Sequence, residues 1–271
     1  MKILNYSLMA SLLLITSGMA VDQIQKQEIA KKLANPLAAI VSIPIQVHYK
    51  PNMGLNDEGS EWLTNIQPIV PFTINDEWTL LTRTIIPIIS QDTGIPSVGT
   101  VDGVGDILFT AWLAPQEKTE SGWLWGMGGA FLLPSGSEMS SEKWGAGPSA
   151  IALHQGKHIN YGILANHVWS YAGSNRVTND VSITHLQPFA SYVTDGAITF
   201  SCNTESNYDW KTKEWTVPVT VLVSKIVHIG KLPFSVGVGT TYWAEAPENG
   251  PEGWGAKFAV TFILPKKIFG L

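Results

Sequence analysis

The chain has 271 residues, of which 45% are hydrophobic and only 14% are charged. This composition is too apolar for a disordered protein, and a net charge of −5 leaves no basic surface to neutralise nucleic-acid phosphates. We therefore expect a folded chain with no nucleic-acid partner. The single cysteine, Cys202, excludes an intramolecular disulfide and a cysteine-cluster metal site.

Residues 1–20 have the pattern of a secretory signal peptide. Lys2 supplies a positive start, a short apolar core follows, and small residues precede a cleavage site after Ala20. The next segment, residues 21–36, is expected to lie in the periplasm. Within it, residues 22–33 contain no glycine or proline and favour a short helix that ends before Asn35-Pro36.

From residue 37 to the C-terminus, apolar and polar residues alternate along about twelve stretches, as in strands with one buried face. Most have about ten or more residues, which is long for a soluble strand and suits a tilted membrane strand. The expected strands are 40–50, 62–74, 78–89, 105–115, 123–134, 145–155, 158–169, 182–193, 197–203, 215–225, 231–243 and 254–265.

The connections between these stretches alternate between long and short. The long ones are 51–61, 91–104, 135–144, 171–181, 204–214 and 244–253, and the short ones lie near 75–76, 116–122, 155–157, 195–196 and 228–230. Such sorting in an even number of strands is typical of an outer-membrane barrel with its short turns in the periplasm. We predict an all-β fold: residues 37–271 form an up-and-down antiparallel transmembrane β-barrel of about 12 strands.

Tryptophan and tyrosine residues gather near the ends of the expected strands. They are Tyr49, Trp62, Trp78, Trp123, Trp144, Trp169, Tyr171, Trp215, Tyr242, Trp243 and Trp254. This placement favours interfacial girdles, whose rings are buried while a polar atom stays in water. The alternative is that they are ordinary core aromatics.

Prolines fall within several expected strands, where each removes a donor from the hydrogen-bond ladder. They are Pro44, Pro68, Pro71, Pro87, Pro188 and Pro218. We expect bulges or local bends at these positions.

Several segments carry a resemblance to a known family. They are residues 33–48, with the opening ANP…SIPIQ, and residues 65–72, 83–87, 103–110 and 147–150. The chain resembles the phenol-degradation meta-pathway-type family of outer-membrane transporters over nearly its whole mature length. The resemblance implies a β-barrel in the outer membrane of a Gram-negative bacterium and passage of aromatic or other hydrophobic small molecules. It supplies no catalytic residue.

The candidate functional residues are polar side chains on the face of each strand that points into the barrel. By parity they are Gln46, His48, Asn65, Gln67, Arg83, Asp106, His158, Asn160, Asn166, His185, Gln187 and Lys257. A charge is costly on the lipid face, so Arg83 and Asp106 should point inward. Arg83 then either lines a solute path or pairs with an inward carboxylate and fills the barrel.

No residue spacing indicates a catalytic group, a metal site or a cofactor, so we expect no enzymatic activity and no cofactor. The favoured function is a passive channel for small solutes, hydrophobic or aromatic ones among them. The alternatives are a closed structural or ligand-binding barrel and a secreted soluble β-sandwich. The expected partners are outer-membrane lipid, the outer-membrane assembly machinery and an unidentified small-molecule solute.

Overall fold

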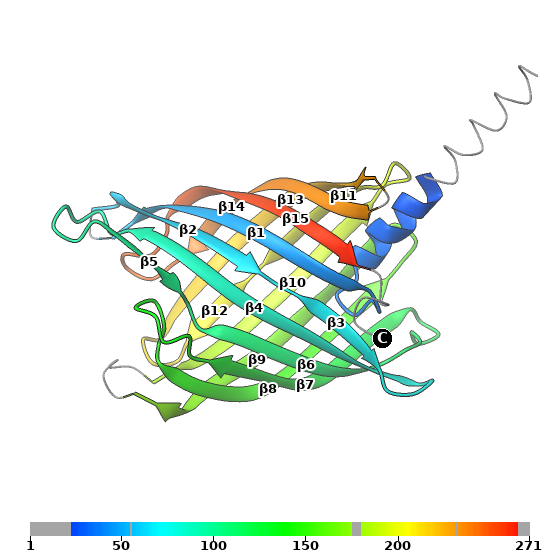
Figure 1. The fold of residues 1–271 in the computed structure, drawn as a ribbon, viewed down its shortest axis with the longest axis horizontal. Helices are drawn as coiled ribbons and strands as arrows, with labels where there is room; N and C mark the ends of the chain where they lie inside the picture. Colours follow the sequence, from blue (N-terminus) through cyan, green and yellow to red (C-terminus); the bar gives the residue numbers. More distant parts are fainter. Residues whose placement is uncertain (1–22, 55, 175–179, 231, 265–271) are drawn as a thin grey trace, which may run out of the picture.

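The computed structural model describes residues 23–54, 56–174, 180–230 and 232–264. Within these ranges a short helix occupies residues 23–33, and the other regular elements are strands (Figure 1). The strands are β1 (Val41–Met53), β2 (Gly59–Ile66), β3 (Ile69–Thr73), β4 (Trp78–Asp92), β5 (Thr100–Val104), β6 (Ile107–Pro115), β7 (Trp123–Leu133), β8 (Lys143–Gln155), β9 (Ile159–Gly173), β10 (Ser182–Val193), β11 (Ile198–Thr204), β12 (Ser206–Asp209), β13 (Glu214–Ile229), β14 (Leu232–Glu245) and β15 (Gly253–Leu264). The predicted signal peptide, residues 1–20, lies outside the described residues.

These strands form one closed antiparallel barrel of twelve strands, as predicted. Three of the twelve are interrupted, so that β2 continues into β3, β5 into β6 and β11 into β12. The barrel closes where β1 pairs with β15, in a register that runs from Val41 opposite Leu264 to Tyr49 opposite Ala256. Closure leaves no unpaired sheet edge, which a bilayer requires because lipid cannot satisfy backbone groups.

Proline and its neighbours mark several of the interruptions. Between β2 and β3, the amide of Gln67 donates to the carbonyl of Pro44 on β1. Between β5 and β6, the amide of Gly105 donates to the carbonyl of Pro87 on β4. The pairing of β13 with β14 shifts register at Pro218. Pro68 and Pro218 therefore lie at local breaks in the ladder, as expected. At Pro71, Pro87 and Pro188 the pairing with β4, β2 and β9, respectively, continues without a register shift, so the expected bulge is absent on those sides.

Short turns gather at the end of the barrel that carries the N-terminal helix (Figure 1). Two predictions about the opposite end are wrong. Residues 91–104 are not one long loop, because β5 occupies Thr100–Val104 and pairs with β4. Residues 204–214 do not form a long loop either. Strand β12 occupies Ser206–Asp209 and pairs with both β10 and β13, which leaves a turn at residues 210–213. The interruption at Glu205 breaks the alternation, which is why the sequence pattern suggested a loop.

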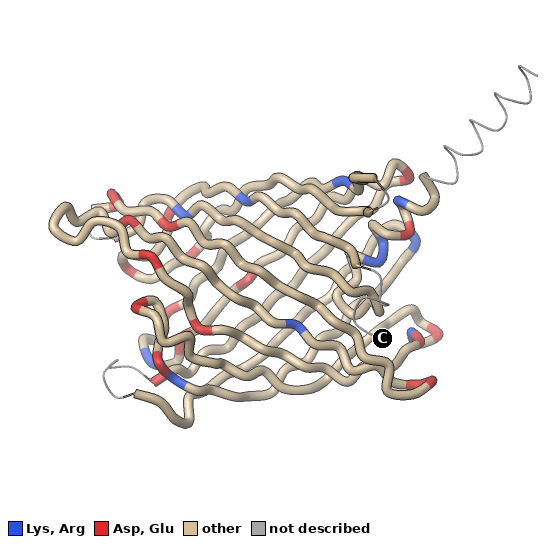
Figure 2. The backbone as a smooth tube through the Cα atoms, in the orientation of Figure 1, with Lys and Arg blue, Asp and Glu red and all other residues tan. Residues whose placement is uncertain are grey.

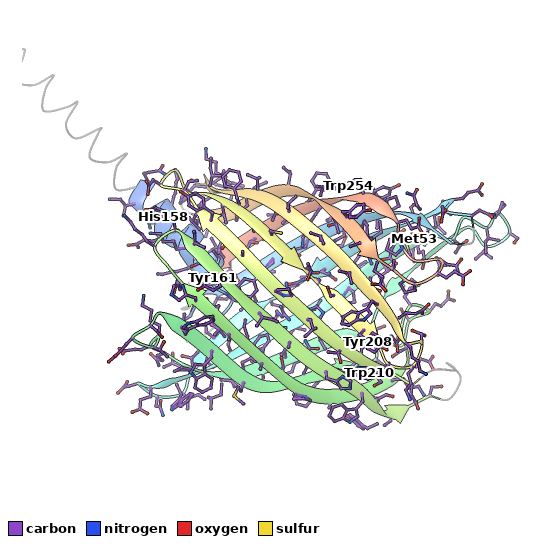
Figure 3. All side chains as sticks on the ribbon, turned by 180° about the vertical axis from the view of Figure 1, so that it is seen from behind. Met53, His158, Tyr161, Tyr208, Trp210 and Trp254 are labelled. Carbon is purple, nitrogen blue, oxygen red and sulfur yellow. The ribbon has the colours of Figure 1, made fainter. Side chains whose placement is uncertain are left out.

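The outer surface has an apolar middle with aromatic residues toward both ends. Exposed aliphatic and phenylalanine side chains include Met127, Phe131, Ile163, Phe200, Val221, Val238 and Phe258. At the long-loop end, the ring of Tyr49 packs at a tilt against Trp62 and that of Tyr242 against Trp254, with ring centroids 4.8 and 5.0 Å apart. Figure 3 shows Tyr208, Trp210 and Trp254 toward this end and Tyr161 toward the other. Figure 2 shows most charged residues at the two ends of the barrel.

This surface is that of a bacterial outer-membrane barrel, because an apolar band between aromatic girdles matches the bilayer. Trp243 is an exception to the predicted girdle: it is only 8% exposed, on the inward-facing side of β14. Trp210 and Tyr161 lie on the surface and were not predicted. Among the described residues, no helix has the length and apolar content needed to cross a membrane.

Candidate functional site: the interior chamber

The barrel encloses a chamber of about 540 Å³, within the range of known small-molecule sites. We call this cavity the main chamber. Its polar lining residues are Ser42, Gln46, Asn65, Gln67, Arg83, Asp106, Ser141, Asn166, His185, Gln187, Glu205, Asn207 and Thr261. Its apolar lining residues are Leu33, Pro36, Pro44, Ile69, Ile85, Leu108, Leu132, Val168, Val181 and Ile183. The walls can therefore contact both polar and apolar parts of a solute.

The main chamber runs along the barrel interior. Leu33 and Pro36 line it near the N-terminal helix, and Ser141 and Val181 line it near the long loops. A second cavity of about 240 Å³ has Ala30 and Lys257 in its walls and shares five lining residues with the first. The shared residues are Leu33, Gln46, Gln187, Glu205 and Thr261. The two cavities are therefore adjacent parts of one interior.

The structure places most of the candidate residues on these walls. Gln46, Asn65, Gln67, Arg83, Asp106, Asn166, His185 and Gln187 line the main chamber, and Lys257 lines the second cavity. His48 and Asn160 are buried in the barrel, 8% and 1% exposed, and line neither cavity. His158 lies in the turn between β8 and β9, where its Nδ1 is 2.9 Å from the carbonyl oxygen of Val193.

Arg83 projects from β4 into the main chamber, and its neighbours across the sheet carry no charge. Its cross-strand neighbours are Ile69 on β3 and Thr110 on β6. The guanidinium carbon lies 5.3 Å from the ring centroid of Trp112, a distance typical of a cation–π contact. No carboxylate of the described residues forms an ion pair with Arg83, and its Nε atom is buried without a hydrogen-bond partner there. The alternative of pairing with an inward carboxylate is therefore not what the structure contains.

Glu205 lies in the wall formed by β10 to β12, where it interrupts the strand between β11 and β12. Its Oε1 is 3.6 Å from Nζ of Lys257 on β15. Oε1 also accepts hydrogen bonds from Nδ2 of Asn203, at 3.1 Å, and from Nε2 of Gln187, at 3.5 Å. Sequence analysis missed Glu205 because it fell in an expected loop. A carboxylate amid a strand of Thr, Ser and Asn was the available signal.

The N-terminal segment, residues 23–39, closes much of the short-turn end. Ala30 is 2% exposed and packs in an apolar cluster with Val193, Ala197 and Ile226 from the barrel wall. Gln27 donates a 2.9 Å hydrogen bond to the carboxylate of Asp195. Further along, Leu37 packs against a second apolar cluster of Leu81, Trp112, Ile151 and Leu164. The helix prediction is confirmed, and its position in the barrel mouth is a finding of the structure.

The loop between β7 and β8 is tied to the interruption between β5 and β6. Asp106 accepts hydrogen bonds from the hydroxyl of Ser140 and from the amide of Ser141, the latter at 3.0 Å to Oδ2. The hydroxyl of Ser137 donates to the carbonyl of Val104. Ser140 is 7% exposed, and Ser141 lines the main chamber. Asp106 therefore holds this loop against the outer end of the chamber.

Replacing Asp106 should release this loop. In the Asp106→Ala protein, the amide of Ser141 loses its acceptor, and its hydrogen exchange should accelerate about 10-fold, because a hydrogen bond to a charged group contributes roughly 1.5 kcal/mol. Mass-spectrometric exchange of the peptide covering residues 134–142 measures this change. Asp102→Ala, at an exposed position of β5, is the control and should exchange like the unaltered protein. Equal exchange in both variants would show that Asp106 does not hold the loop.

Metal ligation has no obvious place in this interior. In the part of the chain that the structure describes, no group of three or more His, Cys, Asp or Glu side chains could hold a metal ion. Some of the chamber's polar atoms contact one another, as for Nδ1 of His185 and Oδ1 of Asn207 at 2.9 Å.

The fold is that of known outer-membrane channels. The chain is similar to the COG4313 outer membrane channel from Pseudomonas putida F1, with 14% identity and a TM-score of 0.64 over 84% of this chain and 97% of that one. It is also similar to the NanC porin, with 12% identity and a TM-score of 0.52 over 82% and 99% of the two chains. No protein-family profile and no curated protein matches the sequence. These likenesses establish the barrel fold.

The sequence-based expectation that the chain is not an enzyme is wrong. The matching solved structures include outer membrane phospholipase A from Escherichia coli, with 10% identity and a TM-score of 0.48 over 89% and 98% of the two chains. The structure also brings Nδ1 of His167 to 2.8 Å from the hydroxyl oxygen of Thr184, its cross-strand partner on β10, a contact that sequence analysis did not find.

Proposed function

We propose that this chain is an outer-membrane channel through which small solutes cross by way of the main chamber. The observation that carries the proposal is the pair of adjacent cavities, of about 540 and 240 Å³, inside a closed transmembrane barrel. A barrel whose only role was structural could fill this interior with side chains, as small barrels do. The mixed polar and apolar walls suit small organic solutes better than ions alone.

The proposal extends to hydrophobic or aromatic solutes. The apolar wall residues, Ile69, Ile85, Leu108 and Leu132 among them, support it because they offer contact area to an apolar body. The sequence also supports it, because the ANP…SIPIQ segment and the segments 65–72, 83–87, 103–110 and 147–150 resemble those of phenol-degradation meta-pathway-type transporters. Membership of that family is part of the proposal and rests on those motifs.

The orientation and processing of the chain belong to the same proposal. Residues 1–20 would be removed as a signal peptide, the assembly machinery would insert the barrel, and residues 21–36 would face the periplasm together with the short turns. The sorting of turn lengths supports this orientation, because outer-membrane barrels keep their short turns on the periplasmic side.

A second candidate is a closed barrel that binds a ligand without transporting it. The packing of residues 23–39 across the short-turn end favours this candidate, since a fixed segment there would block diffusion. The two candidates differ in whether the segment moves.

Swelling of proteoliposomes separates the two. Liposomes that contain the full mature protein should swell in an iso-osmotic solution of a small sugar such as arabinose, and protein-free liposomes should not. Arabinose tests for an open path without requiring a specific ligand. Swelling no faster than that of protein-free liposomes would contradict the channel and leave the binding barrel.

A further inference from the structure

Arg83 is the only arginine or lysine among the described residues that line the main chamber. On the inward face of β4 its neighbours are Leu81 and Ile85, and across the sheet they are Ile69 and Thr110. The next row toward the long loops pairs Ile85 with Leu108, and the next row toward the short turns pairs Leu81 with Trp112. All of these side chains are uncharged, and the charge of Glu205, which also lines the chamber, acts on Arg83 from beyond ion-pair distance.

The carboxylates that line the chamber are engaged elsewhere. Asp106 accepts hydrogen bonds from Ser140 and Ser141. Glu205 pairs with Lys257 and accepts from Asn203. Neither forms an ion pair with Arg83, whose Nε–H also makes no hydrogen bond within the described residues. A charge among apolar groups is costly unless it is paired. No carboxylate of the described residues lies within ion-pair distance of this guanidinium, so the guanidinium is free to contact a bound anion directly.

The chemistry of this site specifies its ligand. A guanidinium presents two parallel N–H donors that match a carboxylate. The apolar side chains of Ile69, Ile85 and Leu108 border it in the main chamber and can cover an apolar body. One unpaired cation favours one negative charge, since a second anionic group would have to compete with Glu205 for Lys257.

We propose that the main chamber binds small monocarboxylates with an apolar or aromatic body, and that Arg83 is the partner of the carboxylate. The proposal names the solute class for the chamber of the proposed channel. It rests on that function only in using the same chamber, because binding can be measured without transport.

Isothermal titration of the full mature protein in detergent tests the site with three probes. Benzoate has the charge and the apolar body, benzamide is its neutral analogue, and acetate has the charge without the ring. At neutral pH, benzoate should bind at least about 10-fold more tightly than either of the others, because a charge-assisted bidentate pair adds affinity to apolar contact. Equal affinities for benzoate and benzamide would overturn the proposal.

Substitution of Arg83 locates the effect. Arg83→Gln should bind benzoate no better than benzamide. Arg83→Lys should keep part of the preference for benzoate, because it retains the positive charge but loses the two parallel N–H donors of the guanidinium. Lys50→Gln is the matched control: it removes an inward cation that pairs with Glu61 and lines neither cavity, so the preference should remain. An undiminished preference in Arg83→Gln would contradict the assignment.

Folding of each variant is checked by the shift in electrophoretic migration on heating. If Arg83→Gln does not fold, the affinities for benzoate and benzamide in the unaltered protein and in Arg83→Lys still show whether Arg83 binds the carboxylate. The channel and the site can also fail separately. If benzoate binding depends on Arg83 but arabinose causes no swelling, the site is retained and the channel is rejected. If arabinose causes swelling but benzoate is not preferred, the channel is retained and the site is rejected.

Discussion

Deleting residues 23–37 is expected to raise the single-channel conductance of the reconstituted protein by at least about threefold, because the barrel is wide enough for a water path once its mouth is cleared. The segment has cavities on both sides. Leu33 and Pro36 border the main chamber, while Asn35 and Leu37 border a third cavity of about 440 Å³ at the short-turn end. Removing the segment joins these spaces, and planar-bilayer recording measures the result.

The barrel should survive this deletion because its first strand begins at Val41. A double variant, Gln23→Ala with Gln27→Ala, is the control: it removes the side-chain hydrogen bonds to Asp195 and keeps the apolar contacts of Ala30. It should open more often than the unaltered protein without reaching the conductance of the deletion. If the deletion conducts no more than the unaltered protein, the wall side chains alone block the interior.

Replacing Glu205 with Gln should reduce the free energy of unfolding by about 3 kcal/mol, because it leaves the buried ammonium of Lys257 without its counter-charge. The Lys257 side chain is only 5% exposed, and the Nζ–Oε1 distance is 3.6 Å. Denaturant titration of the folded protein, followed by tryptophan fluorescence, measures the loss.

The double variant Glu205→Gln, Lys257→Met should recover most of that stability, since it removes the unpaired charge as well. Glu61→Gln is the control at another inward ion pair. Its partner Lys50 has a 24% exposed side chain, so the loss should be only about 1 kcal/mol. A double variant no more stable than Glu205→Gln would show that the charge of Lys257 is not what destabilises the single variant.

The strands could be predicted because the barrel has two different faces. Period-two alternation in segments such as β13 and β15 records which side chains face lipid and which face the interior. The same parity indicated that Arg83 points inward. The local alternation of apolar and polar residues was enough to predict each strand that runs without interruption.

Features that depend on contacts between distant residues could not be predicted. The helical composition of residues 22–33 indicates a helix, but its place against Val193 and Ile226 depends on residues far along the chain. Glu205 escaped notice because the strand is broken there, and its partner Lys257 comes from another strand. Trp243 was assigned to the girdle by its position near a strand end, whereas its parity places it inside.

The most direct measurement is solute flux through a barrel whose main chamber has been filled. Ile183 lines this chamber, and Ile183→Trp adds bulk there, while Phe200→Trp adds bulk on the lipid-facing surface, where Phe200 is 49% exposed. If solutes cross through the chamber, arabinose swelling of proteoliposomes should fall to the protein-free level with Ile183→Trp and stay unchanged with Phe200→Trp. Unchanged swelling with a correctly folded Ile183→Trp protein would contradict a solute path through the chamber.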